Sequence, residues 1–238
     1  MAAAFWLISD LDDTIKISHT KSKLITVYRG LFRSSAFAGM PELYREMLGD
    51  RKDSFFIVSS SPPAIKKKIE YFLTKNHFNA ATLVLRDWRQ EKSVIRFKMK
   101  RIFQLIEQAP CQVILVGDDT QYDPEVFRHA KKKFKDKVSA IYVRSIEGRK
   151  LPKGCVPFFT AFDVACAELA AGRLRSDQVL KVGEAVLLAE KNSRLIPRFS
   201  LKPPLSFIPF LSAVDLPLQE IWKKIQARIE SMPKRKVK

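Results

Sequence analysis

Short apolar runs alternate along most of the chain with stretches of helical period. The runs are apolar throughout rather than at every second position, which is typical of strands that are buried on both faces. They cover residues 5–9, 54–60, 82–85, 112–117 and 139–143. The intervening stretches repeat apolar residues at intervals of three and four, and they cover residues 40–48, 62–73, 93–108 and 123–134. This alternation predicts an α/β fold with a mostly parallel sheet and helices on both faces.

The pattern changes after about residue 172. Residues 176–193 have a helical period, whereas residues 194–210 hold four of the 13 prolines and predict an irregular connector. A last amphipathic helix is predicted after Asp215, which would be its N-cap. Its apolar face would comprise Leu218, Ile221, Trp222, Ile225 and Ile229. We therefore predict one domain over residues 1–172 and a helical, proline-rich extension over residues 173–238, packed on or tethered to that domain.

Charge and cysteine content narrow the partners and the compartment. Lys and Arg outnumber Asp and Glu by 43 to 25, which gives a net charge of +18 over 238 residues and favours an anionic partner such as a phosphoester, nucleic acid or an acidic membrane surface. The three cysteines lack metal-ligand spacing and indicate a reducing compartment. The sequence has neither a signal-peptide pattern nor an apolar stretch of about 20 residues. We expect a cytoplasmic protein that can contact membranes peripherally.

Acidic residues gather at the ends of two predicted strands. Asp10 and Asp12 follow the first strand, and because they lie two positions apart they point to the same side. Asp118 and Asp119 end the fourth strand, with Asp123 shortly after. A single cluster of this kind is equally well explained as a turn and a helix cap. Two clusters at the carboxyl ends of parallel strands instead predict one acidic crevice.

The crevice has the composition of a phosphoryl-transfer site. Carboxylates at such a site suit Mg²⁺, which binds one or two carboxylates together with substrate phosphate. The end of the second strand adds the hydroxyls of Ser59, Ser60 and Ser61, followed by two prolines that place a helix start just beyond. Serines before proline are also common turn residues, so this third feature is weak when taken alone. Together the three strand ends predict hydrolysis of a phosphate ester.

The motifs "DLDDT", "FFIVSSSP" and "LVGDDTQYD" resemble the haloacid-dehalogenase (HAD) superfamily. The motifs "FAGMPELYREM", "LVLRDW", "FKMKRI" and "AIYVRSI" are, with these, similar to the catalytic domain of the actin-patch-type phosphatidate phosphatases, over about residues 5–170. The resemblance implies a HAD-like Rossmann-type three-layer sandwich with a small flap rather than a large cap. It also implies a Mg²⁺-dependent phosphomonoester hydrolase that acts through an aspartyl-phosphate intermediate on phosphatidate or a related lipid.

The resemblance further implies a role for each motif residue. Asp10 would be the nucleophile and a metal ligand, and Asp12 the general acid and base, binding the metal through its backbone carbonyl. Ser59 would hold the phosphoryl group, with Ser60 beside the substrate, and Thr14 would steady the loop there. Lys98 matches the motif lysine, with Lys100 as its competitor. Asp118 would complete the metal site, supported by Asp123 or Asp119. Three positions depart from the family pattern and flank the phosphate site: Ser60, Pro63 and Asp119.

Two basic segments bear on the choice of substrate. Residues 16–39 carry several basic residues and no acid, and they form either a flap that attracts anions to an open crevice or an ordinary surface loop. The last predicted helix and the terminal "PKRKVK" would contact anionic lipid, or the helix would pack on the domain and the tail remain solvated. A HAD phosphatase acting on nucleic-acid ends or nucleotides is the alternative enzyme. A non-catalytic module that binds anionic membranes is the alternative of another class.

Overall fold

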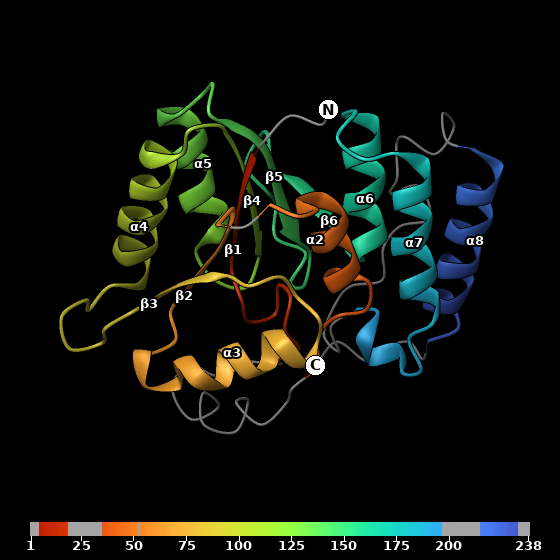
Figure 1. Cartoon of the computed structure of the whole chain (residues 1–238), viewed down its shortest axis with the longest axis horizontal. Helices are drawn as coiled ribbons and strands as arrows, with labels where there is room; N and C mark the ends of the chain where they lie inside the picture. The colour runs from red at the N-terminus through yellow and green to blue at the C-terminus, as the bar shows by residue number, and fades with distance from the viewer. Residues whose placement is uncertain (1–4, 19–34, 52, 197–214, 233–238) are drawn as a thin grey trace.

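The computed structural model describes residues 5–18, 35–51, 53–196 and 215–232, which form an α/β sandwich (Figure 1). The strands are β1 (Phe5–Ser9), β2 (Phe55–Ser59), β3 (Thr82–Leu85), β4 (Gln112–Asp118), β5 (Val138–Arg144) and β6 (Val156–Phe158). The α-helices are α2 (Met40–Leu48), α3 (Lys66–Lys75), α4 (Val94–Gln108), α5 (Asp123–Lys133), α6 (Ala161–Ala170), α7 (Ser176–Leu187) and α8 (Leu216–Glu230). Two short 3₁₀ helices are η1 (Pro63–Ile65) and η2 (Asn192–Arg194).

The strands form one sheet in the order β3-β2-β1-β4-β5-β6, and every neighbouring pair is parallel. The two central strands are β1 and β4, and Leu7 of β1 lies opposite both Phe55 of β2 and Ile114 of β4. All carboxyl ends of parallel strands reach the same edge of a sheet, so the acidic ends of β1 and β4 are neighbours. The predicted α/β fold with a parallel sheet is confirmed, and the five predicted strands match β1 to β5 within a few residues.

Helices cover both faces of the sheet and complete a three-layer, Rossmann-like sandwich. One face packs against α4 and α5, and the opposite face packs against α2, α3 and α6. Figure 1 shows α6, α7 and α8 side by side, and each packs on the next. One hydrophobic cluster is continuous from the sheet through α6 and α7 to α8. The predicted domain boundary at residue 172 stays a prediction, although the core does not end there.

The apolar face of α8 is buried against the rest of the protein. Leu218, Ile221, Ile225 and Ile229 are each less than 10% exposed, and Trp222 packs partly buried against the same cluster. Gly183 of α7 permits this approach, because a Cβ added there would lie 2.6 Å from a methyl carbon of Ile221. The packing interpretation of this helix is therefore confirmed, and its apolar face is not available to lipid. Asp215 holds the N-cap position but makes no capping hydrogen bond through its side chain.

Several sequence predictions fall outside the described residues. They concern residues 19–34 of the basic segment, residues 197–214 of the proline-rich connector and residues 233–238 of the basic tail. The described ends of the basic segment pair with each other, since Lys16 forms an antiparallel bridge with Ala36 and Phe37 N–H donates to the Ile15 carbonyl at 3.0 Å. A membrane-spanning helix is also absent from the described part of the chain, where every helix is too short or too polar.

Candidate active site

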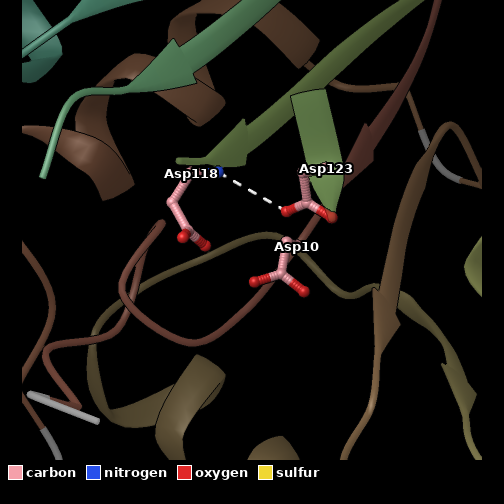
Figure 2. A group of neighbouring side chains, drawn as sticks. All are labelled: Asp10, Asp118 and Asp123. Atoms are coloured by element: carbon pink, nitrogen blue, oxygen red, sulfur yellow. Dashed lines mark hydrogen bonds between the residues drawn. The ribbon is translucent and has the colours of Figure 1, made fainter. Parts of the chain in front are cut away.

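Three buried carboxylates converge at the carboxyl edge of the sheet. Figure 2 shows the side chains of Asp10, Asp118 and Asp123 gathered at one place, the first just after β1, the second at the end of β4 and the third at the start of α5. One carboxylate oxygen from each lies within 4.8 Å of the other two. All three residues are less than 10% exposed. The structure therefore brings together the two strand ends that the sequence predicted to share a crevice, and we call these residues the aspartate trio.

Lys98 of α4 places its ammonium group against the trio. Its Nζ donates to Asp10 Oδ1 at 2.8 Å and to Asp123 Oδ1 at 2.5 Å. The helix presents Lys98 on its buried side together with Phe97 and Ile102, whereas Lys100 is exposed. The geometry thus selects Lys98 over Lys100 as the lysine of the site.

Burial and mutual repulsion raise the pKa values of Asp10 and Asp118. Burial raises the pKa of Asp10 well above its usual range, with Lys98 opposing the rise and the charges of Asp123 and Asp118 adding to it. Burial and the charge of Asp123 together raise the pKa of Asp118 to about 7. Burial alone would lower the pKa of Lys98, but the three carboxylates outweigh it and raise that pKa. Three carboxylates facing one lysine leave a local excess of negative charge that favours a cation.

Short contacts fix the orientation of Asp118. Thr14 Oγ1 donates to Asp118 Oδ2 at 3.3 Å, and the Thr120 backbone N–H donates to Oδ1 at 2.7 Å. Gly117 lets Asp123 approach the end of β4, because an added Cβ would lie 2.5 Å from Asp123 Oδ2. Asp118 N–H in turn donates to that Oδ2 at 3.4 Å, the dashed line in Figure 2. Thr14, which the resemblance implied would steady the loop beside the substrate, contacts a trio carboxylate.

Asp12 lies apart from the trio and closer to solvent. Its side chain is 32% exposed and forms an ion pair with Lys16 at 3.1 Å. It also accepts hydrogen bonds from Ser18 Oγ and, at 3.5 Å, from Ser61 Oγ. The Asp12 carboxylate is therefore more exposed to solvent than the carboxylates of the trio. Sequence reasoning assigned no role to Lys16 or Ser18, whose contacts depend on a fold-back of the loop that spacing alone does not reveal.

The serines after β2 divide into buried and peripheral groups. Ser59 is 1% exposed, and its Oγ accepts from the backbone N–H of Ser61 at 3.2 Å. Ser60 is partly exposed, and its carbonyl accepts from the indole Nε1 of Trp88 at 2.8 Å. The expected helix start follows directly as η1 and α3. Ser61 rather than Ser60 reaches Asp12.

Asp119 belongs to the framework and not to the trio. It is fully buried, and its carboxylate accepts backbone N–H groups from Ile146 at 2.8 Å, Glu147 at 2.9 Å and Arg149 at 3.1 Å. These bonds hold the segment after β5. Asp123 is therefore the residue that stands beside Asp118 in the trio, which resolves the geometric alternative left by the sequence. Asp13 occupies a turn with φ of 59°, as a turn residue should.

Arg144 supports the loop after β1, because it donates a hydrogen bond to the Thr14 carbonyl in that loop. It is fully buried at the end of β5, between the rings of Phe37 and Phe158 at 4.1 and 4.6 Å. Its Nε donates to the Thr14 carbonyl at 3.0 Å and its Nη1 to the Phe159 carbonyl at 2.6 Å. Burial lowers the pKa of Arg144 to about 10. Sequence reasoning missed this residue, and an arginine ending an apolar strand is the signal that was available.

The trio fits a divalent cation of the oxygen-preferring kind. Its ligand atoms are carboxylate oxygens, and no His or Cys joins them in the described part of the chain. Mg²⁺ prefers such ligands. The raised pKa of Asp118 is the electrostatic cost that a bound cation would remove.

Comparison with known proteins identifies the family. The model of the family described as "Phosphatidate phosphatase APP1, catalytic domain" matches residues 5–145, which include every residue of the trio and Lys98. The chain belongs to this family. It is 27% identical over 149 residues to phosphatidate phosphatase APP1 of Saccharomyces cerevisiae, a match that covers 58% of this chain and 25% of that protein. The chain thus spans about a quarter of the length of that relative. No solved structure matches the chain. The sequence-based assignment to this family is confirmed, and the fold agrees with the HAD superfamily.

Proposed function

We propose that this protein is a Mg²⁺-dependent phosphatase that hydrolyses phosphatidate to diacylglycerol and phosphate. The observation that carries the proposal is the buried aspartate trio with Lys98 against it, inside the segment that matches the phosphatidate phosphatase family. The relative from Saccharomyces cerevisiae is itself named a phosphatidate phosphatase. The free state of all three cysteines supports a cytoplasmic location as part of the proposal.

In the proposed reaction, Asp10 attacks the phosphorus atom and forms an aspartyl-phosphate, while Asp12 gives its proton to the departing glycerol oxygen. Asp12 then takes a proton from water, whose oxygen attacks the same phosphorus and releases phosphate from Asp10. Asp12 suits both steps because it stands at the partly exposed side of the crevice. Ser59, with Ser60 beside it, is at the strand end where the phosphoryl oxygens would lie.

Mg²⁺ would be held by the carboxylates of Asp10, Asp118 and Asp123 and by the Asp12 carbonyl. When bound, it neutralises charge on the phosphoryl oxygens. Lys98 supplies a second positive charge from the protein, and it keeps the Asp10 carboxylate oriented through its 2.8 Å contact.

The test compares two matched substitutions in one loop. Asp10→Asn should abolish the release of phosphate from phosphatidate in mixed micelles with Mg²⁺, whereas Asp13→Asn should retain it because Asn tolerates the same left-handed turn. With an activated aryl phosphate, whose leaving group needs no proton from Asp12, the Asp12→Asn variant should accumulate the aspartyl-phosphate, detected by mass spectrometry after an acid quench. Undiminished hydrolysis by Asp10→Asn would refute the nucleophile assignment.

The net charge of +18 favours one alternative, a phosphatase for nucleic-acid ends. The same protein is therefore assayed on phosphatidate and on oligonucleotides that carry a 5′ or 3′ phosphate. Activity on the oligonucleotides alone would replace the lipid proposal. Absence of activity on both substrates, with binding to anionic vesicles retained, would favour a non-catalytic membrane module instead.

A further inference from the structure

The loop between β3 and α4 exposes a tryptophan among cations. Trp88 is 41% exposed, although it is one of the largest apolar side chains in the protein. The guanidinium carbon of Arg86 lies 5.6 Å from the Trp88 ring centre, and Arg89 next to it is exposed. Just after Ser60 and Ser61, which this loop contacts, η1 and the start of α3 expose further apolar and basic groups. We define the Trp88 surface as Pro63, Ala64, Lys67, Arg86, Trp88 and Arg89.

The Trp88 surface adjoins the active site through backbone contacts. Trp88 Nε1 donates to the Ser60 carbonyl at 2.8 Å, and the Arg86 backbone N–H donates to the Ser61 carbonyl at 3.1 Å. The Ser61 hydroxyl then reaches Asp12 at 3.5 Å. The exposed indole is thus joined to the loop that also contacts Asp12, so the Trp88 surface adjoins the Asp12 side of the site.

Helix α3 also exposes basic and aromatic side chains. Its inner face buries Ile69, Phe72 and Leu73, while Lys67 and Tyr71, one turn apart, point to solvent. Tyr71 is 62% exposed. In Figure 1, α3 lies in the lower part of the view, and the β3–α4 loop contacts the Ser60–Ser61 segment that leads into it.

This combination fits the surface of an anionic bilayer. Tryptophan and tyrosine favour the interfacial layer, where one end of the ring is apolar and the other is hydrated. Lys and Arg near such a surface gain attraction to acidic headgroups. Pro63 and Ala64 add apolar area with no polar side chain, which suits lipid and offers nothing to a nucleic-acid backbone. Phosphatidate is itself an acidic lipid, so the same charges that dock the protein attract its substrate.

We propose that the Trp88 surface docks on anionic lipid bilayers and so holds the active-site crevice over the phosphate headgroups. This inference rests on the proposed function, since it supplies the surface on which the lipid substrate is reached. It also replaces the C-terminal helix as the membrane-contacting element, because the apolar face of α8 is buried.

The first test measures binding to vesicles of phosphatidylcholine and phosphatidylserine, a lipid mixture that contains no substrate. Lys67→Glu combined with Arg89→Glu should weaken sedimentation with these vesicles at least tenfold. The matched control is Lys132→Glu with Lys135→Glu. Both control lysines are exposed at the end of α5 away from the trio, so the same charge change there should leave vesicle binding within about twofold of the wild type.

A second measurement separates docking from catalysis. The Lys67→Glu, Arg89→Glu protein should lose phosphatidate hydrolysis in vesicles at least tenfold while retaining hydrolysis of a soluble aryl phosphate. If the wild type cleaves the aryl phosphate but not phosphatidate in mixed micelles, the proposed function fails, while the binding assay without substrate still decides the docking surface.

A third measurement asks whether the indole enters the bilayer. The chain has three tryptophans, and brominated phosphatidylcholine in the anionic vesicles should quench fluorescence in the wild type but not in Trp88→Phe. Vesicle binding that is equal in the wild type and the Lys67→Glu, Arg89→Glu protein, or quenching that persists in Trp88→Phe, would overturn the proposal. So would selective binding of phosphorylated oligonucleotides over vesicles by the wild type.

Discussion

Replacing Lys98 with methionine removes a buried charge while keeping the length of the side chain. Lys98 contacts Asp10 at 2.8 Å and Asp123 at 2.5 Å, and the side chains of the three residues are 3%, 9% and 1% exposed. Removing one partner of a buried ion pair typically costs about 3–5 kcal/mol. Each kcal/mol lowers the melting temperature of a chain of this size by about 2–4 °C, so we expect a decrease of about 6–20 °C in metal-free protein at pH 8.

The size of this effect should depend on pH and on Mg²⁺. Burial and the charge of Asp123 raise the pKa of Asp118 to about 7, above its usual value of 3.8. A carboxylate whose pKa is higher in the folded state than in the unfolded state contributes its full stabilisation at a pH below the unfolded pKa. This contribution is lost as the pH rises through the folded pKa, here about 7. Metal-free protein should therefore be less stable at pH 8 than at pH 5. The deficit of Lys98→Met should be larger at pH 8, where the carboxylates are charged, and Mg²⁺ should reduce it.

Thermal unfolding measures all of these differences. The wild type and Lys98→Met are compared in EDTA and in MgCl₂ at both pH values, with Lys100→Met as the matched control. Lys100 is exposed on the same helix, and its replacement should change the melting temperature by about 2 °C or less. Equal effects of the two substitutions in EDTA at pH 8, or a Lys98→Met deficit that is independent of pH, would refute the electrostatic account of the trio.

Three further substitutions test the framework around the site. Gly117→Ala places a Cβ 2.5 Å from Asp123 Oδ2, so half-saturation of activity should need about 10–100-fold more Mg²⁺; an unchanged Mg²⁺ titration would contradict the close approach. Arg144→Met removes the donor to the Thr14 carbonyl. The free energy of unfolding measured in urea should fall by about 1–3 kcal/mol, and Mg²⁺ binding should weaken. A loss of stability with unchanged Mg²⁺ binding would make Arg144 purely structural. Ile225 lies in the buried face of α8. Ile225→Ala should lower the free energy of unfolding measured in urea by about 2–5 kcal/mol and leave hydrolysis of an aryl phosphate unchanged. A decrease below about 0.5 kcal/mol would show that this face does not pack.

The sequence predicted the elements that carry a clear periodic signal. The five predicted strands and the helices around residues 40–48, 93–108 and 123–134 agree closely with the structure. The pattern did not predict β6, which has three residues, or α6. Helix α6 is apolar on nearly all sides because it lies between the sheet and α7, and it therefore lacks the alternating faces by which a surface helix is recognised.

The candidate site divides in the same way. Asp10 and Asp118 could be placed together from the sequence, because parallel strand ends share one edge of the sheet. The sequence could not distinguish Asp123 from Asp119 as the third carboxylate. The distinction depends on the first turn of α5, which positions Asp123, and on the loop after β5, whose backbone N–H groups hydrogen-bond to the Asp119 carboxylate. Arg144 could not be assigned either, because its partners lie on loops far from it in the sequence.

The central position of β1 determines when the site can form. β1 is among the first residues of the chain, yet it pairs with β4, so Phe5 lies opposite Gln112, and the trio is complete only once Asp123 has joined. Contacts between such distant residues are slow to form, because the intervening chain must be closed into a loop first. A metal ion that binds this site would therefore bind after the sheet has formed and would not nucleate folding. Its stabilising effect should appear in the rate of unfolding, with the rate of folding left nearly unchanged.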